Sequence, residues 1–575
     1  MKSFLKLSVL LLITSLLFYS CGEDSPTNPE EKEVPVLGSK SIGSEGGTIS
    51  IDNFELQVPT GAFQNNSEIK ISKSIEANLF STNNVSDFFV IDGIPAEFDE
   101  PIKIKIKYSG ILKDSSFIAI GENCFVSSLN NEAKSFRLLS ARDSAGYLIA
   151  QIPPTVGNGL EKSNSNYSIE ADDLSFNLGA IAGYASYKSR GNHFLINFPS
   201  SVLTQAYDLA DYLETAYNQF QSIGFSYSRR TKWPVEVTVK VLENSVYGYS
   251  YNSTWGDNYG YMEFNVNKMG DAEELKVTAG HEFFHLVQSL YDPRNRFSKS
   301  KFQSPHLWLD EASSVWSEAF FSGSGSSYVS PIFASNAYEI LNGAKTAGSD
   351  AQSYGYGSAS LIKYLTKNYD NSSLVDVYEK IYNGESAFNA LGDVLPISVD
   401  MSWHPYLRSL FSFELYKGDG FQPSSLMATA KLKSQNFTIK TAADSVKSFK
   451  SSLPDLSATI FSIKNEFEKL NNNAKLEFTC KDWNFQLFKV NGSESKFLAS
   501  GRDTLVLSNF KKIADEGYQI AVVLYNNDFD SPYNNTKSYE MEIKVKAAKT
   551  IQFIYFAIAY TGNFTWTTPE ETTYS

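Results

Sequence analysis

Two histidines and a glutamate, grouped within five residues, could bind a metal ion and use it. His281 and His285 lie four positions apart in the segment HEFFH, with Glu282 between them. On a helix, residues i and i+4 share a face, so both imidazoles can reach one metal ion. Glu282 lies one step round the helix, close enough to a metal-bound water to take its proton. Zn²⁺ lowers the pKa of such a water towards about 7. The pattern therefore predicts zinc-dependent hydrolysis.

A third ligand follows in the segment WLDE, whose last residue is Glu311, 26 residues after His285. With HEFFH, this segment resembles the gluzincins, the thermolysin and aminopeptidase-N group of zinc peptidases. The resemblance implies that Glu311 is the third zinc ligand and that a fourth position stays open for catalysis. A metzincin-like site needs a third histidine six residues after His285, and Tyr291 stands there. His306, just before WLDE, could be a ligand, a substrate contact or a loop residue.

Three further residues extend the predicted site. Glu318 lies two helical turns beyond Glu311 and could orient a histidine, or it could be an exposed helix charge. Tyr354 and Tyr356 stand in YGYG, which resembles the opening of the helix that carries the catalytic tyrosine in aminopeptidase-N-like enzymes. Spacing favours Tyr354, with Tyr356 second, as the group that stabilises the oxyanion. Aromatic packing at a helix start is the structural alternative.

A segment before the metal helix leaves the type of peptidase open. Glu263 stands in GYMEF, which resembles the GxMEN segment of aminopeptidases, where the glutamate binds the free amine of the substrate. Here Phe264 replaces the asparagine. The alternative interpretation is an edge strand, which could pair with an extended peptide.

Composition indicates a large, ordinary globular chain. It has 575 residues, 42% of them hydrophobic and 20% charged, and a net charge of −14. A soft prior on length gives about three or four domains. No basic stripe is available to neutralise phosphates, so we expect no nucleic-acid partner. The sequence does not predict the oligomeric state.

The N-terminus indicates the compartment. Lys2 and Lys6 precede an apolar run over residues 7–18, a signal-peptide pattern that is too short for a spanning helix. The segment ending at Ser20-Cys21 resembles the lipobox of bacterial lipoproteins, which implies diacylation of Cys21. We expect a cell-envelope protein held on the outer membrane or cell surface by this anchor. A cleaved signal with an incidental cysteine is the alternative.

Five segments follow from these patterns. Residues 1–20 are the signal peptide, 21–35 a linker, 36–187 a β-sandwich region, 188–430 the zinc peptidase domain and 431–575 a C-terminal β-sandwich. The first β region alternates apolar and polar residues strictly, as a half-buried sheet does. It resembles the ZU-type sandwich of netrin receptors and zonula-occludens proteins.

The predicted fold is thus a multi-domain chain, with an α+β gluzincin-like core flanked by antiparallel β-sandwiches. In the core, helices are expected over about 272–291, 310–320 and 358–367. Cys124 and Cys480 are too far apart in the chain to favour a disulfide, and two buried thiols are expected.

The predicted function is zinc-dependent hydrolysis of protein or peptide substrates, with Glu282 activating the water. Two alternatives stay open. One is an aminopeptidase that uses Glu263, and the other is a surface binding protein whose metal site is vestigial.

Overall fold

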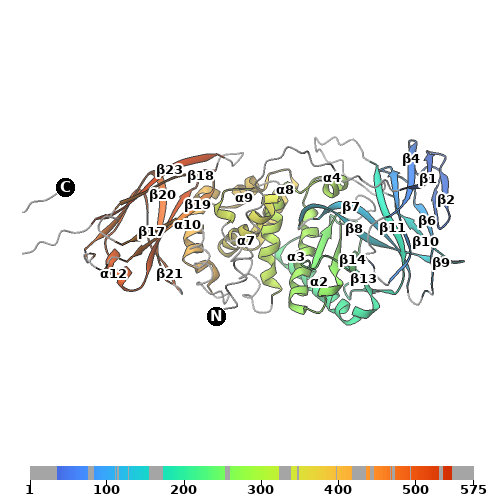
Figure 1. Ribbon diagram of the computed structural model, residues 1–575, viewed down its shortest axis with the longest axis horizontal. Coiled ribbons are helices and arrows are strands. Elements are labelled where there is room, and N and C mark those ends of the chain that lie inside the picture. Colours follow the sequence, from blue (N-terminus) through green and yellow to red (C-terminus); the bar gives the residue numbers. More distant parts are fainter. Residues whose placement is uncertain are drawn as a thin grey trace, which may run out of the picture.

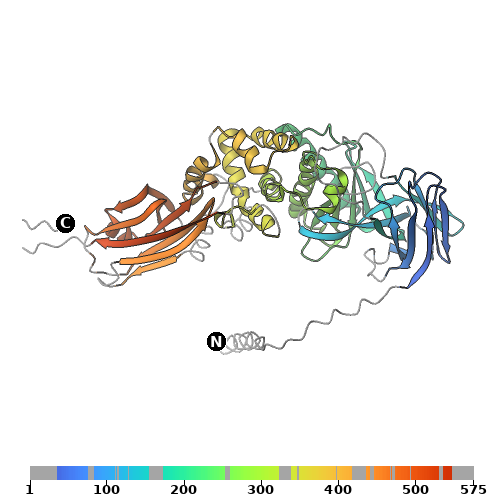
Figure 2. The ribbon, with the colours of Figure 1, turned by 90° about the horizontal axis from the view of Figure 1, so that it is seen from above.

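The structure is a computed structural model that describes residues 35–546 apart from short gaps. The gaps are residues 75–79, 81–82, 111, 113–114, 127–128, 155–172, 253–259, 323–338, 346–348, 397, 418–434, 441–445, 467, 469, 471–472, 492–493 and 530–534. The predicted signal peptide and Cys21 lie outside the described residues. Three parts follow one another along the long axis of the molecule: an N-terminal β-module, a central region rich in helices, and a C-terminal β-module (Figure 1, Figure 2). The multi-domain prediction is confirmed.

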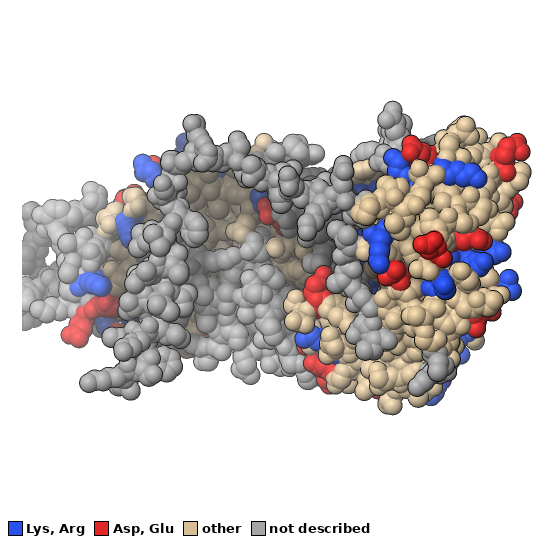
Figure 3. All heavy atoms as spheres, turned by 45° about the vertical axis from the view of Figure 1, so that its right-hand side comes forward, with Lys and Arg blue, Asp and Glu red and all other residues tan. Residues whose placement is uncertain are grey.

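The N-terminal β-module consists of two facing sheets. Its strands are β1 (Val36–Ile42), β2 (Gly47–Ile51), β3 (Phe54–Val58), β4 (Ser67–Lys73), β5 (Asn84–Ile94), β6 (Ile102–Lys107), β7 (Phe117–Val126), β8 (Leu129–Ser140), β9 (Arg142–Ser144), β10 (Tyr147–Ile152) and β11 (Leu174–Ile181). A five-stranded sheet, β2-β3-β6-β10-β9, packs on the part of a larger sheet ordered β1-β4-β5-β11-β7. Strand β6 shows why: its three isoleucines are fully buried while its lysines are not. Acidic and basic side chains are interspersed over the face of this module seen in Figure 3, so neither sign dominates it.

The larger sheet continues into the central region. There it adds β12 (Tyr184–Lys188), β13 (Phe194–Pro199), β14 (Val235–Lys240), β15 (Gly248–Tyr251) and β16 (Tyr261–Asn265), in the order β7-β15-β16-β14-β13-β12. Strands β13, β14 and β16 are parallel, and β15 is antiparallel to β16. Among the described residues β15 pairs with β7 only at Tyr251–Val126. The predicted domain boundary at 187/188 falls within β12, which pairs with β13. The boundary itself stays a prediction.

The helices of the central region cover this sheet and extend beyond it. They are α2 (Leu203–Ile223), α3 (Ala272–Ser289), α4 (Arg296–Lys301), α5 (Leu307–Ser317), α7 (Ser349–Tyr369), α8 (Ser372–Tyr382), α9 (Ala387–Val394) and α10 (Val399–Phe411), with short 3₁₀ turns η4 (Glu318–Phe320) and η6 (Glu414–Tyr416) among them. Helix α3 packs between α2 and α5, and α5 packs on α7. The three predicted helices correspond to α3, to α5 with η4, and to α7, which begins nine residues earlier than predicted.

The C-terminal β-module is one seven-stranded sheet that bends into a barrel-like form. It contains β17 (Gln435–Ile439), β18 (Val446–Pro454), β19 (Ser457–Asn465), β20 (Lys475–Val490), β21 (Ser495–Leu507), α12 (Phe510–Asp515), β22 (Gln519–Asn526) and β23 (Thr536–Lys546). The long strand β20 pairs with β23 along its first half and with β22 along its second. The β17–β19 pair is parallel, which departs from the predicted antiparallel arrangement.

The C-terminal β-module contacts the central region through α10. Gln486 Nε2 donates a hydrogen bond to the carbonyl of His404 at 2.8 Å, and Ser495 Oγ donates to the carbonyl of Phe411 at 2.5 Å. Cys480 is buried and has a free thiol, as predicted, whereas the side chain of Cys124 lies outside the described set. Within the described residues, no helix is long and apolar enough to cross a membrane.

Candidate metal centre

The helix that carries HEFFH is α3, and it is buried on almost every side. Asp271 caps its N-terminus by accepting a hydrogen bond from the backbone N–H of Glu274, and Glu273 and Glu274 place negative charge in the first turn. From Ala279 to Ser289 every residue is buried. A helix with polar side chains in such a position needs partners for them, because an unpaired buried polar group costs about 1–3 kcal/mol.

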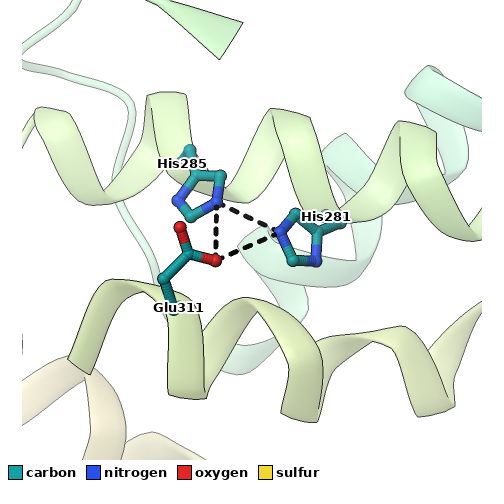
Figure 4. A group of neighbouring side chains, drawn as sticks. All are labelled: His281, His285 and Glu311. Atoms are coloured by element: carbon teal, nitrogen blue, oxygen red, sulfur yellow. Dashed lines mark hydrogen bonds and ion pairs between the residues drawn. The ribbon is translucent and has the colours of Figure 1, made fainter. Parts of the chain in front are cut away.

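His281, His285 and Glu311 come together between α3 and α5 (Figure 4). The two Nε2 atoms are 3.1 Å apart, and each is 3.7 Å from Oε2 of Glu311. A triangle with sides of 3.1, 3.7 and 3.7 Å has a circumscribed circle of about 2.0 Å radius, which matches the usual Zn–N distance of about 2.0–2.1 Å. The three atoms are therefore spaced to hold one zinc-sized ion.

The carboxylate of Glu311 fits a metal ligand better than it fits a structural ion pair. The side chain is fully buried, and neither carboxylate oxygen has a hydrogen-bond partner among the described residues. Burial raises the pKa of Glu311 to about 7, so the charged form is costly without a cation. Two imidazoles and one carboxylate are a donor set found in catalytic zinc sites.

Glu318 orients the first histidine. Its Oε1 lies 2.6 Å from Nδ1 of His281, and both groups are buried. A carboxylate can only accept a hydrogen bond, so Nδ1–H must donate and the lone pair of Nε2 is left for a metal. Glu318 lies in η4 at the end of α5, on the same side as Glu311, and is not an exposed helix charge.

Gln288 orients the second histidine in the same way, although it was not among the site residues predicted from the sequence. Its Oε1 lies 2.9 Å from Nδ1 of His285. Its Nε2 donates to the carbonyl of Asp310 at 2.9 Å and to the hydroxyls of Ser313 and Ser314 at 2.9 and 3.1 Å. Because a carbonyl can only accept, the amide nitrogen must face α5 and the amide oxygen must face His285. The signal was available, since Gln288 follows His285 by three residues and so shares its helix face.

Glu282 projects towards β15. The hydroxyl of Ser250 donates to its Oε2 at 2.8 Å, and the backbone N–H of Ser250 also donates to this carboxylate. Burial raises the pKa of Glu282, while the charge of His281 and the bonds from Ser250 oppose the rise. A carboxylate with a raised pKa is a better proton acceptor near neutral pH.

The two tyrosines of YGYG lie in different surroundings on α7. Tyr354, favoured by spacing, is 1% exposed and packs against the ring of Trp308 with the ring centroids 5.6 Å apart. Tyr356 is half-buried and lies near the acidic groups of the centre: burial and the charges of Glu311 and Glu318 raise its pKa well above the usual value. The hydroxyl of Tyr356 thus stays protonated and can donate.

Helix α7 reaches the metal centre through a glycine. A Cβ added to Gly355 would lie 2.6 Å from Cβ of Glu311 and 2.7 Å from the carbonyl oxygen of Trp308. Only a glycine lets α7 approach α5 this closely, so Gly355 helps to fix the position of the third ligand.

The interpretation of Glu263 as an amine-binding residue or an edge-strand residue is wrong. Strand β16 lies inside the sheet, between β15 and β14. Met262 and Phe264 face the core that contains α3, so Glu263 points to the opposite face of the sheet. There its Oε1 accepts from the backbone N–H of Phe136 at 2.7 Å, and Oε2 pairs with Lys240 at 3.1 Å.

His306 is not part of the metal cluster. It lies immediately before α5 and lines a small cavity whose other walls include His285, Asp292 and Arg294. Burial lowers its pKa to about 4, which keeps the ring neutral.

Comparisons with known proteins add no family. No protein-family model matches the chain, and no curated protein matches its sequence. Among solved structures, periplasmic inhibitors of g-type lysozyme match about a fifth of the chain. The inhibitors from Aeromonas hydrophila, Escherichia coli (a mutant) and Salmonella Typhimurium are 8%, 11% and 12% identical, with TM-scores of 0.14, 0.13 and 0.14. Each match covers 20% of this chain and 98–99% of the inhibitor. Scores this low carry no argument about function.

Proposed function

We propose that the protein is a zinc-dependent peptidase of the gluzincin type. The observation that carries the proposal is the buried group of His281, His285 and Glu311, with ligand atoms spaced for one ion and a carboxylate that has no other hydrogen-bond partner among the described residues. Glu282, next to His281 in the chain and within reach of its charge, adds a base. A vestigial site would not need to keep the base and both orienting bonds.

Each residue of the centre has a distinct chemical role. Bound Zn²⁺ supplies Lewis acidity, which makes a water molecule easier to deprotonate and polarises the scissile carbonyl. Glu282 takes the proton of the attacking water and passes it to the nitrogen of the leaving amine. The hydroxyl of Tyr356 donates a hydrogen bond to the oxyanion of the tetrahedral intermediate. Glu318 and Gln288 hold the two imidazoles in the tautomer that leaves Nε2 free.

The test is the Glu282→Gln variant, which keeps the shape of the side chain and removes the base. We expect it to bind zinc as the wild type does and to cleave casein at least about 100-fold more slowly. Glu273→Gln, an exposed change on the same helix, is the matched control. Wild-type-like cleavage by Glu282→Gln with full zinc content contradicts the mechanism.

We further propose that the peptidase acts on proteins or peptides in the bacterial cell envelope, anchored by lipid at Cys21. The support is the N-terminal sequence pattern alone. Metabolic labelling with palmitate tests it: the wild type should be labelled and partition with membranes, and Cys21→Ser should lose both properties. Labelling of Cys21→Ser to the same extent contradicts the proposal.

A further inference from the structure

A cavity of about 270 Å³ lies between the end of α5, the helix that carries Glu311, one face of α7 and η6. Its walls are largely apolar and include Val315, Trp316, Phe320 and Ala359. A cavity of about 150 Å³ already holds a benzene ring. This one therefore has room for a phenyl or indole group.

Tyr356 connects the cavity to the reaction centre. Its side chain lines the cavity, and the preceding residue, Gly355, packs against Glu311 so closely that an added Cβ would lie 2.6 Å from Cβ of Glu311. The charges of Glu311 and Glu318 also raise the pKa of Tyr356. Glu311 and Val315 are one turn apart on α5, so the carboxylate ligand and the apolar wall lie on one helix face. A peptide whose carbonyl meets Tyr356 can place a neighbouring side chain in the cavity.

The charge of the cavity is unlike that of the chain. Lys363, Lys367 and Lys417 line it, and no acidic side chain does so among the described residues. The whole chain has 64 acidic and 50 basic residues. Lys363 and Tyr356 lie seven residues apart on α7, or about 10 Å along the helix. The ring of Tyr416 lies 5.4 Å from Nζ of Lys363, and Lys367 Nζ donates to the carbonyl of Glu414 at 2.7 Å, so both lysines are held at the cavity.

We propose that this cavity is a specificity pocket of the peptidase. It binds one large apolar side chain of the substrate next to the scissile bond, and its lysines bind a carboxylate further along the same peptide. The carboxylate can be an acidic side chain or the C-terminus of the peptide. This inference rests on the proposed peptidase function and names its substrate class: peptides in which a large apolar residue is accompanied by a negative charge.

The experiment measures cleavage and binding separately, with the zinc-loaded full chain. Peptides carry Phe or Ala at one position, Asp or Lys beyond it, and a C-terminal acid or amide. Cleavage gives kcat/KM for each peptide, and fluorescence anisotropy of labelled peptides on Glu282→Gln gives their Kd without turnover. The variants are Ala359→Phe, which fills the pocket, and Lys363→Glu, which reverses its charge. Lys512→Met, an exposed change in the C-terminal β-module, is the control.

We expect Phe to be preferred over Ala by about 10- to 200-fold in kcat/KM. Ala359→Phe should bring this ratio close to 1, and Lys363→Glu should reverse a preference of a few-fold for Asp over Lys that weakens as salt is added. The control should change neither ratio. If a C-terminal amide lowers kcat/KM as much as replacing Asp by Lys does, the bound carboxylate is the C-terminus of the peptide. If the amide leaves kcat/KM unchanged, the bound carboxylate is an acidic side chain.

Two results would overturn the pocket. One is that neither assay shows a preference for Phe over Ala. The other is that Ala359→Phe melts at the same temperature as the wild type and still prefers Phe as strongly. If Ala359→Phe is unstable, Lys363→Glu provides the test: a variant that still prefers Asp over Lys as the wild type does would overturn the pocket. Failure of the proposed function is distinct. A chain that binds Phe–Asp peptides selectively on Glu282→Gln, but whose wild type cleaves none of them, keeps the pocket and loses the peptidase.

Discussion

Replacing Glu318 should weaken zinc binding without unfolding the protein. Glu318 Oε1 lies 2.6 Å from Nδ1 of His281, and the carboxylate is 1% exposed, so water cannot replace it. A hydrogen bond to a charged group contributes about 1.5–3 kcal/mol. Loss of that bond in Glu318→Leu should therefore raise the Kd for zinc by about 10- to 100-fold, the range seen when a partner of a metal-bound histidine is removed. Glu318→Gln keeps a neutral acceptor and should raise it by less than about 10-fold.

In the metal-free protein, the same substitution of Glu318 should change the free energy of unfolding little. Oε2 of Glu318 has no hydrogen-bond partner among the described residues, and burial raises the pKa of the carboxyl to about 7. Without zinc the buried charge is thus costly, and removing it offsets the loss of the bond to His281. We expect the free energy of unfolding of metal-free Glu318→Leu to lie within about 1 kcal/mol of wild type.

Two assays separate these effects. Competition with a chromophoric chelator gives the Kd for zinc, and urea denaturation in the presence of EDTA gives the free energy of unfolding. Glu540→Gln, an exposed change on β23, is the matched control. An unchanged Kd in Glu318→Leu refutes the orienting role, and a parallel loss of metal-free stability shows that Glu318 acts only as a structural residue.

Three other changes test neighbouring parts of the site. Gln288→Leu removes the acceptor for Nδ1–H of His285, and we expect the Kd for zinc to rise about 10-fold or more by chelator competition. Gly355→Ala forces Cβ against Glu311, so it should lower both zinc affinity and melting temperature. If no clash occurs, the better helix propensity of alanine should instead raise the melting temperature, which would contradict the packing argument. Tyr356→Phe should lower kcat about 100-fold or more with zinc content and KM little changed, and an unchanged kcat would exclude Tyr356 as the oxyanion donor.

The local part of the site could be predicted from the sequence because helix geometry fixes it. A spacing of four residues places His281 and His285 on one face of any helix, whatever the rest of the fold. The helix itself was visible from its apolar periodicity, and α3 begins where the pattern placed it. Glu311 required the resemblance to known peptidases, because nothing in the spacing of 26 residues dictates that α5 packs against α3.

The sheet around the site could not be predicted to the same degree. Strand β16 alternates like a half-exposed strand, yet all five of its residues are buried. Its neighbours β14 and β15 come from segments whose pairing depends on the whole sheet. Burial of Glu263 is stabilised by Lys240 and by the N–H of Phe136 from the N-terminal β-module, and such long-range partners leave no local pattern.

The residues around the metal ligands were predictable only in part from the sequence. Gln288 lies at a helix spacing that could have shown it, whereas Ser250 contacts Glu282 only because β15 lies beside α3. Tyr354 and Tyr356 differ by two residues, which turns them about 200° apart on a helix, and only the packing of α7 on α5 shows which one faces the carboxylates.

The zinc content of the purified protein tests the central claim most directly. Measured by inductively coupled plasma mass spectrometry after dialysis, the wild type should contain about one zinc per chain, since one group of three ligands is present in the described residues. His285→Ala should lose the ion together with casein hydrolysis, while His306→Ala, a half-buried histidine outside the group of three ligands, should keep it. Equal zinc content in wild type and His285→Ala would contradict the account.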